Sequence, residues 1–234
     1  MVCLGLPRSG STWVYNVARE LLAWRYPEGP IACGFSDDFA GLSSKRLPVR
    51  CLVLKAHNPQ GDFRALLSSA RVHLIISIRD PRDAVASMMQ SFSLPFHEAA
   101  SAVYMSAKAI ANAASYGHHL LLRYEDGFPD DLVTVQRMNA AFGCGADASV
   151  VRRIHEALSK ARVADKLREL GRQGTFRTAP ALSAWDPETH WHPGHLGDGR
   201  VGKYPDVLTT AQIRRLEQHF AFFMSQFFYG GAEG

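Results

Sequence analysis

The chain has 234 residues, of which 47% are hydrophobic, and its 26 basic and 22 acidic residues give a formal net charge of +4. This length and hydrophobic content suit one well-buried core, so we expect a single domain over residues 1–234. The basic excess favours a small anionic ligand, but it is too mild for the dense basic surface of a nucleic-acid-binding protein, so no nucleic-acid partner is expected.

The cysteines and the apolar runs bear on the compartment. The four cysteines are scattered and form no C-x-x-C pair, so neither a zinc site nor a disulfide framework is expected. The apolar start, Val2–Leu6, is too short for a secretory signal, and no run reaches the length of a membrane span. We therefore expect a cytoplasmic protein with reduced thiols and no membrane contact.

The first thirteen residues have the pattern of a short strand, a glycine-bounded turn and a helix start. Gly5 and Gly10 bracket four residues and Thr12 follows, which is the spacing of the phosphate-binding loop G-x-x-x-x-G-K-S/T. Ser11 stands in place of the lysine that reaches the β- and γ-phosphates, which favours a phosphate ligand without a triphosphate to cleave. Arg8 supplies a positive charge from within the loop. The alternative is a turn that needs its glycines only for its geometry.

The remaining chain alternates short apolar runs, typical of strands, with longer runs of helical spacing. Further strands are expected at Cys51–Leu54, Val72–Arg79 and His119–Tyr124. Helices are expected at Thr12–Tyr26, Phe63–Ala70, from Pro81 onward, and at His97–Tyr116, Leu132–Phe142, Val150–Leu170 and Thr210–Phe227. Residues 31–49 lack periodicity and are expected to form a loop or short helical insert, and residues 171–204 a long functional loop. We predict an α/β fold, a P-loop-like three-layer sandwich whose central, mostly parallel sheet is flanked by helices.

Three predicted strands end in polar residues that would share one edge of a parallel sheet. These residues are Arg8 to Thr12, then Lys55 and His57, then Arg79 to Asp83 with Ser87 further along. Asp80 and Pro81 suit the N-cap and first position of a second helix. Two helix N-termini with basic residues would make two anion sites, as a nucleotide with phosphates at two separate positions requires.

Five motifs resemble those of sulfotransferases that use 3′-phosphoadenosine 5′-phosphosulfate (PAPS). Leu6–Trp13 resembles their 5′-phosphosulfate loop, P-K-S-G-T-T-W, and Ile78–Ser87 resembles their 3′-phosphate motif, R-N/D-P-K/R-D followed by serine. Lys55–His57 is similar to their K-T-H, Tyr124–Asp126 to Y-E-D, and Gly199–Tyr204 to G-x-x-G-x-W. The motifs occur in family order and cover nearly the whole chain.

The resemblance implies PAPS as donor and 3′-phosphoadenosine 5′-phosphate (PAP) as product. It assigns the 5′ end to Arg8, Ser9, Gly10, Ser11 and Thr12, and the adenine to Trp13 and Tyr124. It assigns the 3′-phosphate to Arg79 and Ser87, with Gly199, Arg200 and Gly202 closing over it. Lys55 and His57 would serve catalysis.

The transfer chemistry gives these catalytic roles a physical reason. An acceptor hydroxyl or amine attacks sulfur in line, and charge builds on the oxygen that leaves with the 5′-phosphate. Arg8 and Lys55, with the helix dipole, can neutralise that charge. His57 can take the acceptor proton, worth about 10²–10⁴-fold when its pKa lies near neutral. No metal is needed.

The chain departs from the family pattern at several positions. Arg8 replaces the common lysine, Tyr204 replaces tryptophan, and Gly197-Asp198 stands where many members carry Arg-Lys. Residues 188–204 are called the late loop below. The positive charge that the late loop offers to the 3′-phosphate is therefore expected to come from Arg200 and Lys203.

Two other functions remain open. A small-molecule or nucleotide kinase would require a lysine at position 11 and acidic Mg²⁺ ligands, and the sequence offers neither of them clearly. A nucleotide-binding module without catalysis is the second alternative, and the joint presence of Lys55 and His57 argues against it. The identity of the small-molecule acceptor is left open, and a homo-oligomer is allowed but not indicated.

Two polar clusters allow more than one interpretation. His190, His192 and His195 have the count of a metal cluster, but a solvated or nucleotide-covering loop is preferred because no carboxylate pattern accompanies them. Asp37 and Asp38 could face a cationic acceptor, although a helix cap or solvent contact is the preferred interpretation.

Overall fold

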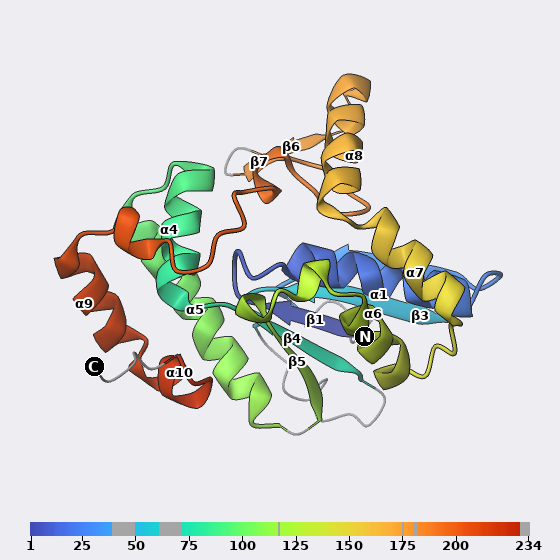
Figure 1. Cartoon of the computed structure of the whole chain (residues 1–234), viewed down its shortest axis with the longest axis horizontal. Coiled ribbons are helices and arrows are strands. Elements are labelled where there is room, and N and C mark those ends of the chain that lie inside the picture. Colours follow the sequence, from blue (N-terminus) through green and yellow to red (C-terminus); the bar gives the residue numbers. More distant parts are fainter. Residues whose placement is uncertain (39–49, 61–71, 117, 175, 180–181, 230–234) are drawn as a thin grey trace.

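Five parallel strands form the centre of the molecule in the order β2-β3-β1-β4-β5 (Figure 1). The structure is a computed structural model and describes residues 1–38, 50–60, 72–116, 118–174, 176–179 and 182–229. The strands are β1 (Val2–Gly5), β2 (Ile31–Phe35), β3 (Cys51–Ala56), β4 (Leu74–Ile78) and β5 (His119–Arg123). Every residue of β1 and β4 is buried, as expected of parallel strands covered on both faces.

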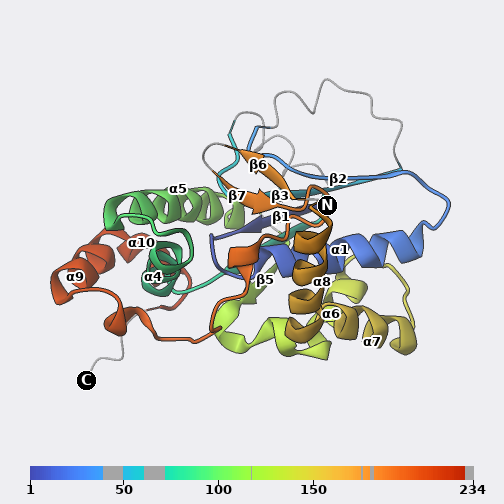
Figure 2. The same ribbon diagram turned by 90° about the horizontal axis from the view of Figure 1, so that it is seen from above.

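Helices cover both faces of this sheet, which confirms the predicted three-layer α/β sandwich (Figures 1 and 2). One face packs against α4 (Pro81–Phe92), α5 (Phe96–Ala114), α9 (Thr210–His219) and α10 (Ala221–Gln226). The other packs against α1 (Ser11–Arg25), α6 (Leu132–Ala141) and α7 (Ala148–Ala157). Leu4 and Ile76 belong to the first core and Cys3 and Ile75 to the second, because neighbouring strand residues point to opposite faces.

A further helix and a β-hairpin lie outside these layers. Helix α8 (Lys160–Gln173) projects from the body, and β6 (Arg177–Ala179) pairs with β7 (Leu182–Trp185) in an antiparallel hairpin (Figure 1). The hairpin falls within the long loop expected at residues 171–204. Among the described residues, no helix combines the length and apolarity that a membrane crossing requires.

The two predicted strand-to-helix junctions are confirmed. Helix α1 begins at Ser11 after Gly10, whose φ of 77° lies in the left-handed region that favours glycine. Helix α4 begins at Pro81, and the Asp80 side chain accepts a hydrogen bond from the Arg82 N–H at 2.8 Å. Both helix N-termini therefore lie at the edge where the strands end.

The expectation of a loop or helical insert after residue 30 is wrong for its first part, which forms strand β2. Ile31 to Phe35 pair with Cys51 to Lys55 of β3 at the edge of the sheet. Cys33 and Phe35 are exposed, so this edge strand lacks the apolar pattern of a buried one, and its main-chain pairing decides the structure. Residues 39–49 and the helix expected at Phe63–Ala70 lie outside the described residues.

The single helix expected at Val150–Leu170 is two helices, α7 and α8. The helix is interrupted at Leu158 and Ser159, and the backbone of Ser159 is extended, with φ −61° and ψ 151°. The freed Leu158 carbonyl accepts a hydrogen bond from the Trp13 indole N–H at 3.1 Å, a tertiary contact that the helical pattern does not reveal.

The C-terminal helix is also divided. The expected helix at Thr210–Phe227 separates into α9 and α10 at Phe220, which has φ −101° and ψ 12°. Phe220 is fully buried, so packing of its ring in the core accompanies the change of direction.

Truncation of a buried side chain in a central strand tests how much the packing of the parallel sheet contributes to stability. Ile76 of β4 is fully buried, so Ile76→Ala should lower the free energy of unfolding by about 2–5 kcal/mol, and Ile76→Val by about 0.5–1.5 kcal/mol. Urea unfolding followed by circular dichroism measures both. Equal losses for the two variants would contradict the tight packing described for β4.

Candidate functional site

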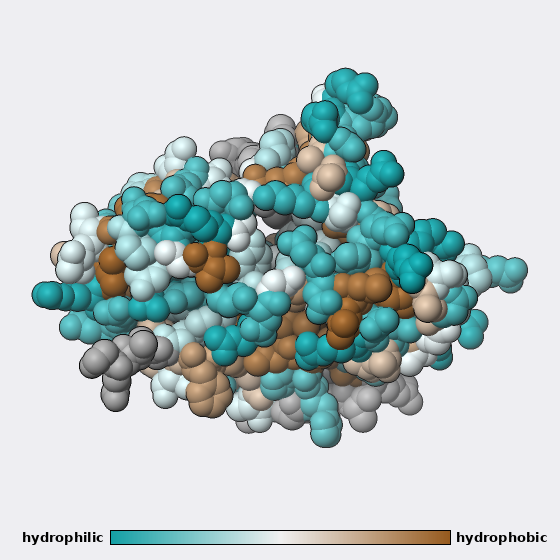
Figure 3. Space-filling view, viewed as in Figure 1, coloured by the Kyte–Doolittle hydropathy of each residue, from teal (hydrophilic) through white to brown (hydrophobic). Residues whose placement is uncertain are grey.

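A cavity of about 960 Å³ lies at the carboxyl ends of the central strands. The space-filling view shows a hollow between α8 with the β6–β7 hairpin and the body of the molecule (Figure 3). Most of the predicted site residues line the cavity, namely Arg8, Gly10, Ser11, Thr12, Trp13, Lys55, His57, Arg79, Ser87, Tyr124 and Gly199. Ser9, Arg200 and Gly202 are not among its lining residues.

The phosphate-loop candidate is held tightly against β4. The Ser9 hydroxyl lies 3.0 Å from the Ser77 carbonyl oxygen and 2.9 Å from the Ser77 hydroxyl, and it is completely buried. Gly5 leaves no room for a side chain, because an added Cβ would lie 2.3 Å from the Ser11 Cβ. No side chain caps the first turn of α1 among the described residues. The start of α1 therefore presents its N–H groups and the positive end of its dipole toward the cavity.

Lys55 lies beside the start of this helix. Its Nζ donates a hydrogen bond to Thr12 Oγ1 at 2.6 Å, and only 5% of the residue is exposed. Burial lowers the pKa of Lys55 to about 8, so the amine is cationic at neutral pH and titrates in the mildly alkaline range.

His57 extends from the end of β3 into the cavity wall. Its Nδ1 lies 2.5 Å from the Gly5 carbonyl oxygen, which requires a proton on Nδ1 and leaves Nε2 as an acceptor. Burial, and then the charge of Lys55, lower the pKa of His57 to about 3, well below the near-neutral value expected from the sequence. The imidazole is thus neutral and in the tautomer that a proton acceptor requires.

Asp37 holds the backbone beside His57. Its Oδ1 accepts hydrogen bonds from the N–H groups of His57 at 2.7 Å and Asn58 at 2.9 Å. Asp37 also lines the cavity. The carboxylate therefore fixes the end of β3, a role closer to the capping interpretation than to solvent exposure.

Arg79 connects three segments at the second junction. Its guanidinium lies 4.3 Å from the centroid of the Tyr124 ring and donates to the Arg200 carbonyl at 2.7 Å. It also donates to the Arg8 carbonyl at 3.2 Å and pairs with Asp83 at 3.4 Å. Arg79 is 3% exposed, so its charge is fixed within the wall of the cavity.

Asp83 is a residue whose importance the sequence interpretation missed. It is completely buried, and its two oxygens accept hydrogen bonds from the N–H groups of Gly202 at 2.6 Å and Tyr204 at 2.9 Å. Asp83 thus binds the late loop to α4. An acidic residue in the first turn, on the same face as buried Ala84 and Ser87, is the sequence signal that could have identified it.

The expected late-loop cations are engaged elsewhere. The Arg200 side chain forms an ion pair with Asp206, and Lys203 Nζ lies 3.1 Å from Asp198. Neither Arg200 nor Lys203 lines the cavity. Tyr124, expected at the adenine, lies 3.5 Å from the Gly199 carbonyl through its hydroxyl.

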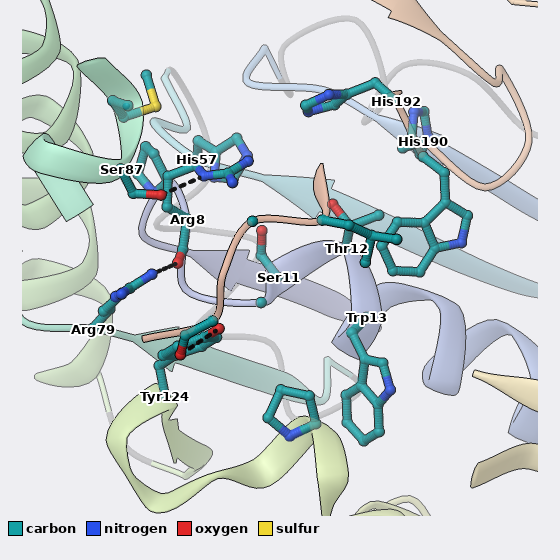
Figure 4. Close-up of a pocket in the computed structure, with 18 of the residues that line it drawn as sticks. Arg8, Ser11, Thr12, Trp13, His57, Arg79, Ser87, Tyr124, His190 and His192 are labelled. Carbon is teal, nitrogen blue, oxygen red and sulfur yellow. Dashed lines mark hydrogen bonds between the residues drawn. The ribbon is translucent and has the colours of Figure 1, made fainter. Parts of the chain in front are cut away.

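Arg8 is directed toward α4 (Figure 4). Its Nε donates to Ser87 Oγ at 3.0 Å and its Nη1 to the Gly194 carbonyl at 2.8 Å. Burial, and then the neighbouring charge of Arg79, lower the pKa of Arg8 to about 10. The φ of 66° at Arg8 is uncommon for a residue with a side chain.

Two histidines of the late loop also line the cavity. Burial lowers the pKa of His190 to about 4 and that of His192 to about 3, with a further lowering by the charges of Lys55 and of nearby arginines. Within the described part of the chain, no group of three or more potential ligands could hold a metal ion. The His195 side chain lies outside what the structure describes.

The late loop is fastened to α1 as well. The Asn16 amide donates to the Thr189 carbonyl at 2.9 Å, and the Tyr15 hydroxyl to the Glu188 carbonyl at 3.2 Å. Trp13, one turn earlier, is 5% exposed and packs beside Phe128 with ring centroids 5.7 Å apart. The first turns of α1 therefore form one wall of the cavity.

Solved structures with a similar fold were found by structural comparison. One is a mouse sulfotransferase, SULT7A1, complexed with PAP. The match covers 95% of this chain and 83% of the sulfotransferase chain, with a TM-score of 0.61 and 16% sequence identity. Another is retinol dehydratase in complex with androsterone and inactive cofactor PAP. The match covers 95% of this chain and 80% of the dehydratase chain, with a TM-score of 0.59 and 14% sequence identity. These likenesses show that the chain shares the fold of this sulfotransferase and of retinol dehydratase. No protein-family model and no curated protein sequence matches it.

Removal of the Asp83 charge should release the late loop. Asp83→Asn leaves the Arg79 cation buried without its counter-charge, so the free energy of unfolding should fall by about 3–5 kcal/mol. Hydrogen exchange should become faster at the N–H groups of Gly202 and Tyr204. The control, Asp206→Asn, breaks an exposed pair with Arg200 and should cost less than about 1 kcal/mol. Similar losses for both variants would contradict the role assigned to Asp83.

Proposed function

We propose that this protein is a single-domain sulfotransferase that transfers the sulfuryl group of PAPS to a hydroxyl or amine of a small molecule. The observation that carries the proposal is the placement of two anion-binding junctions on one cavity. The start of α1 with Lys55 forms the first, and Arg79 with Ser87 at α4 forms the second. A nucleotide with a 5′-phosphosulfate and a 3′-phosphate has anionic groups at both ends.

The chain's own groups suit each part of such a nucleotide. The N–H groups of Gly10, Ser11 and Thr12 would bind the 5′-phosphosulfate, in a loop that Ser9 holds in place. Trp13 and Tyr124 would contact the adenine. Arg79 and Ser87 would bind the 3′-phosphate. Gly199, Arg200 and Gly202 would close the site through the main-chain contacts that they make with Tyr124, Arg79 and Asp83.

PAPS would supply an activated sulfuryl group whose sulfur–oxygen bond to the 5′-phosphate breaks as the acceptor attacks. His57 Nε2 would take the acceptor proton, since Nδ1–H is engaged with the Gly5 carbonyl. Lys55 and the start of α1 would stabilise the negative charge that passes to the leaving phosphate. The sequence assigns this task to Arg8 as well. Arg8 contacts Ser87 on α4, whereas Lys55 contacts Thr12 at the start of α1, so the role of Lys55 in stabilising the leaving phosphate has more support.

The part of the cavity beside His57, where the acceptor would bind, has mainly apolar walls. Phe35 and His57 come from the strand ends, Met88 and Phe92 from α4, and Met105 from α5. These side chains suit a small molecule with an apolar body that places one hydroxyl or amine beside His57. A kinase has less support, because Ser11 occupies the position of the phosphate-loop lysine.

Calorimetric titration with PAP, adenosine 5′-phosphate (AMP) and ATP tests the donor class. PAP should bind most tightly, and Arg79→Ala should weaken PAP binding at least tenfold because a charge-assisted contact is lost. Ser87→Ala should weaken it less while leaving the Arg79–Asp83 pair in place. His57→Ala should keep PAP binding and lose sulfuryl transfer. A preference for ATP, or indifference to the 3′-phosphate, would instead support the kinase.

The pH dependence of the rate tests the roles of Lys55 and His57. With a pKa of about 8, Lys55 loses its proton as pH rises, so kcat/KM for PAPS should fall above about pH 8. With a pKa of about 3, His57 stays neutral, so kcat at saturating PAPS should show no acid limb between pH 5 and 7.

Lys55→Arg is the matched variant for this profile. It should move the alkaline fall beyond about pH 10, because arginine stays charged there. An acid limb of kcat near pH 6.5, or an alkaline limb of kcat/KM unchanged in Lys55→Arg, would contradict these assignments.

A further inference from the structure

The cationic side chains that line the cavity differ in whether they form an ion pair. Four of them line it, namely Arg8, Lys55, Arg79 and Lys160. Arg79 pairs with Asp83, Lys55 donates to Thr12 at the start of α1, and Lys160 is exposed on α8. Arg8 is mostly buried, yet it makes no ion pair with any residue that the structure describes. Lys55 likewise makes no ion pair with a described residue, but it lies at the start of α1, so Arg8 is the cavity cation beside α4 that has no counter-charge there.

The guanidinium of Arg8 lies beside the second anion junction. Its Nε is 3.0 Å from Ser87 Oγ, and the Arg8 carbonyl is 3.2 Å from Arg79 Nη1 (Figure 4). The cation also lies over the Phe92 ring, 5.7 Å from its centroid. Contacts with Ser87 and Phe92 therefore place the side chain along α4, the helix that begins beside Arg79.

The late loop leaves space for Arg8 and contributes no cation of its own there. Gly197 has no side chain, and a Cβ added to it would lie 3.5 Å from Arg8 Nη2. The next residue is acidic, and Asp198 pairs with Lys203. Arg200 is turned to Asp206. The space beside Gly197 is thus filled by a cation that comes from the phosphate loop.

We propose that Arg8 binds the 3′-phosphate together with Arg79 and Ser87, and thereby supplies the positive charge that the late loop lacks. This inference rests on the proposed function. Arg8, Arg79 and Ser87 all line the cavity, Arg8 contacts Ser87 directly, and the charges of Arg8 and Arg79 repel each other, a cost that an anion bound beside both would offset. A phosphate dianion offers both guanidinium groups an acceptor, and arginine suits phosphate geometry. Arg8 is then a residue that selects 3′-phosphorylated nucleotides.

The test compares two ligands that differ only in the 3′-phosphate, PAP and AMP. The measured quantity is the ratio of the Kd for AMP to the Kd for PAP, by calorimetry at fixed salt. Arg8→Ala should lower this ratio at least tenfold and change the Kd for AMP less than about threefold. Arg8→Gln, which keeps a side-chain amide near Ser87 without the charge, should also lower the ratio.

Two further variants sharpen the comparison. Lys160→Ala removes the exposed lining cation and should leave the ratio unchanged. Arg8→Ala combined with Gly197→Arg should recover the preference for PAP, because the new side chain brings a cation from the late loop into the same space. Gly197 does not have a left-handed backbone, so arginine is compatible with its conformation.

The outcomes separate this inference from the proposed function. If Arg8→Ala and Arg8→Gln weaken PAP and AMP by the same factor, Arg8 acts at the 5′ end and the inference is wrong. If Lys160→Ala lowers the ratio and the Arg8 variants do not, the inference is also wrong. A wild-type protein without preference for PAP would overturn the proposed function itself.

Discussion

The buried ion pair between Arg79 and Asp83 joins the parts of the candidate site. Arg79 contacts the phosphate loop through the Arg8 carbonyl and the late loop through the Arg200 carbonyl. Asp83 takes the N–H groups of Gly202 and Tyr204. Each charge keeps the other from being buried alone, and four main-chain contacts attach the pair to the two loops. Two loops that are far apart in sequence are thereby fixed to one strand end and one helix start.

The electrostatic character of the cavity follows from burial. The pKa values of Arg8, Lys55 and His57 are all lowered, to about 10, 8 and 3, chiefly because water is excluded around them. A bound polyanion would offset this cost by stabilising the charged forms of Arg8 and Lys55. The same exclusion of water strengthens each interaction with the anion, so binding and charge stabilisation have one physical origin.

The sequence predicted the parts of the fold that depend on local chemistry. Gly5 and Gly10 predicted the phosphate loop because only glycine fits there, and Asp80 predicted the start of α4 because its side chain caps a helix. The strand at Ile31–Phe35 could not be predicted, since its main chain pairs at the edge of the sheet whatever its side chains. The break between α7 and α8 depends on a tertiary contact of Trp13.

Within the site, the sequence identified which residues meet but not how each one points. The motifs brought Arg79, Ser87 and Lys55 to one edge, because parallel strands end together. The direction of Arg8 depends on its left-handed backbone and on space beside Gly197, and neither is visible in a motif. The low pKa of His57 depends on burial, which arises only once the chain has folded.

The late loop is attached mainly through its main chain. The carbonyls of Gly194, Gly199 and Arg200 and the N–H groups of Gly202 and Tyr204 make its contacts with the rest of the site. Contacts of this kind do not use the side chain, although Gly199 and Gly202 have left-handed backbones that favour glycine. Outward-facing positions of the loop can therefore accept many substitutions during evolution or directed redesign while the closed arrangement is kept.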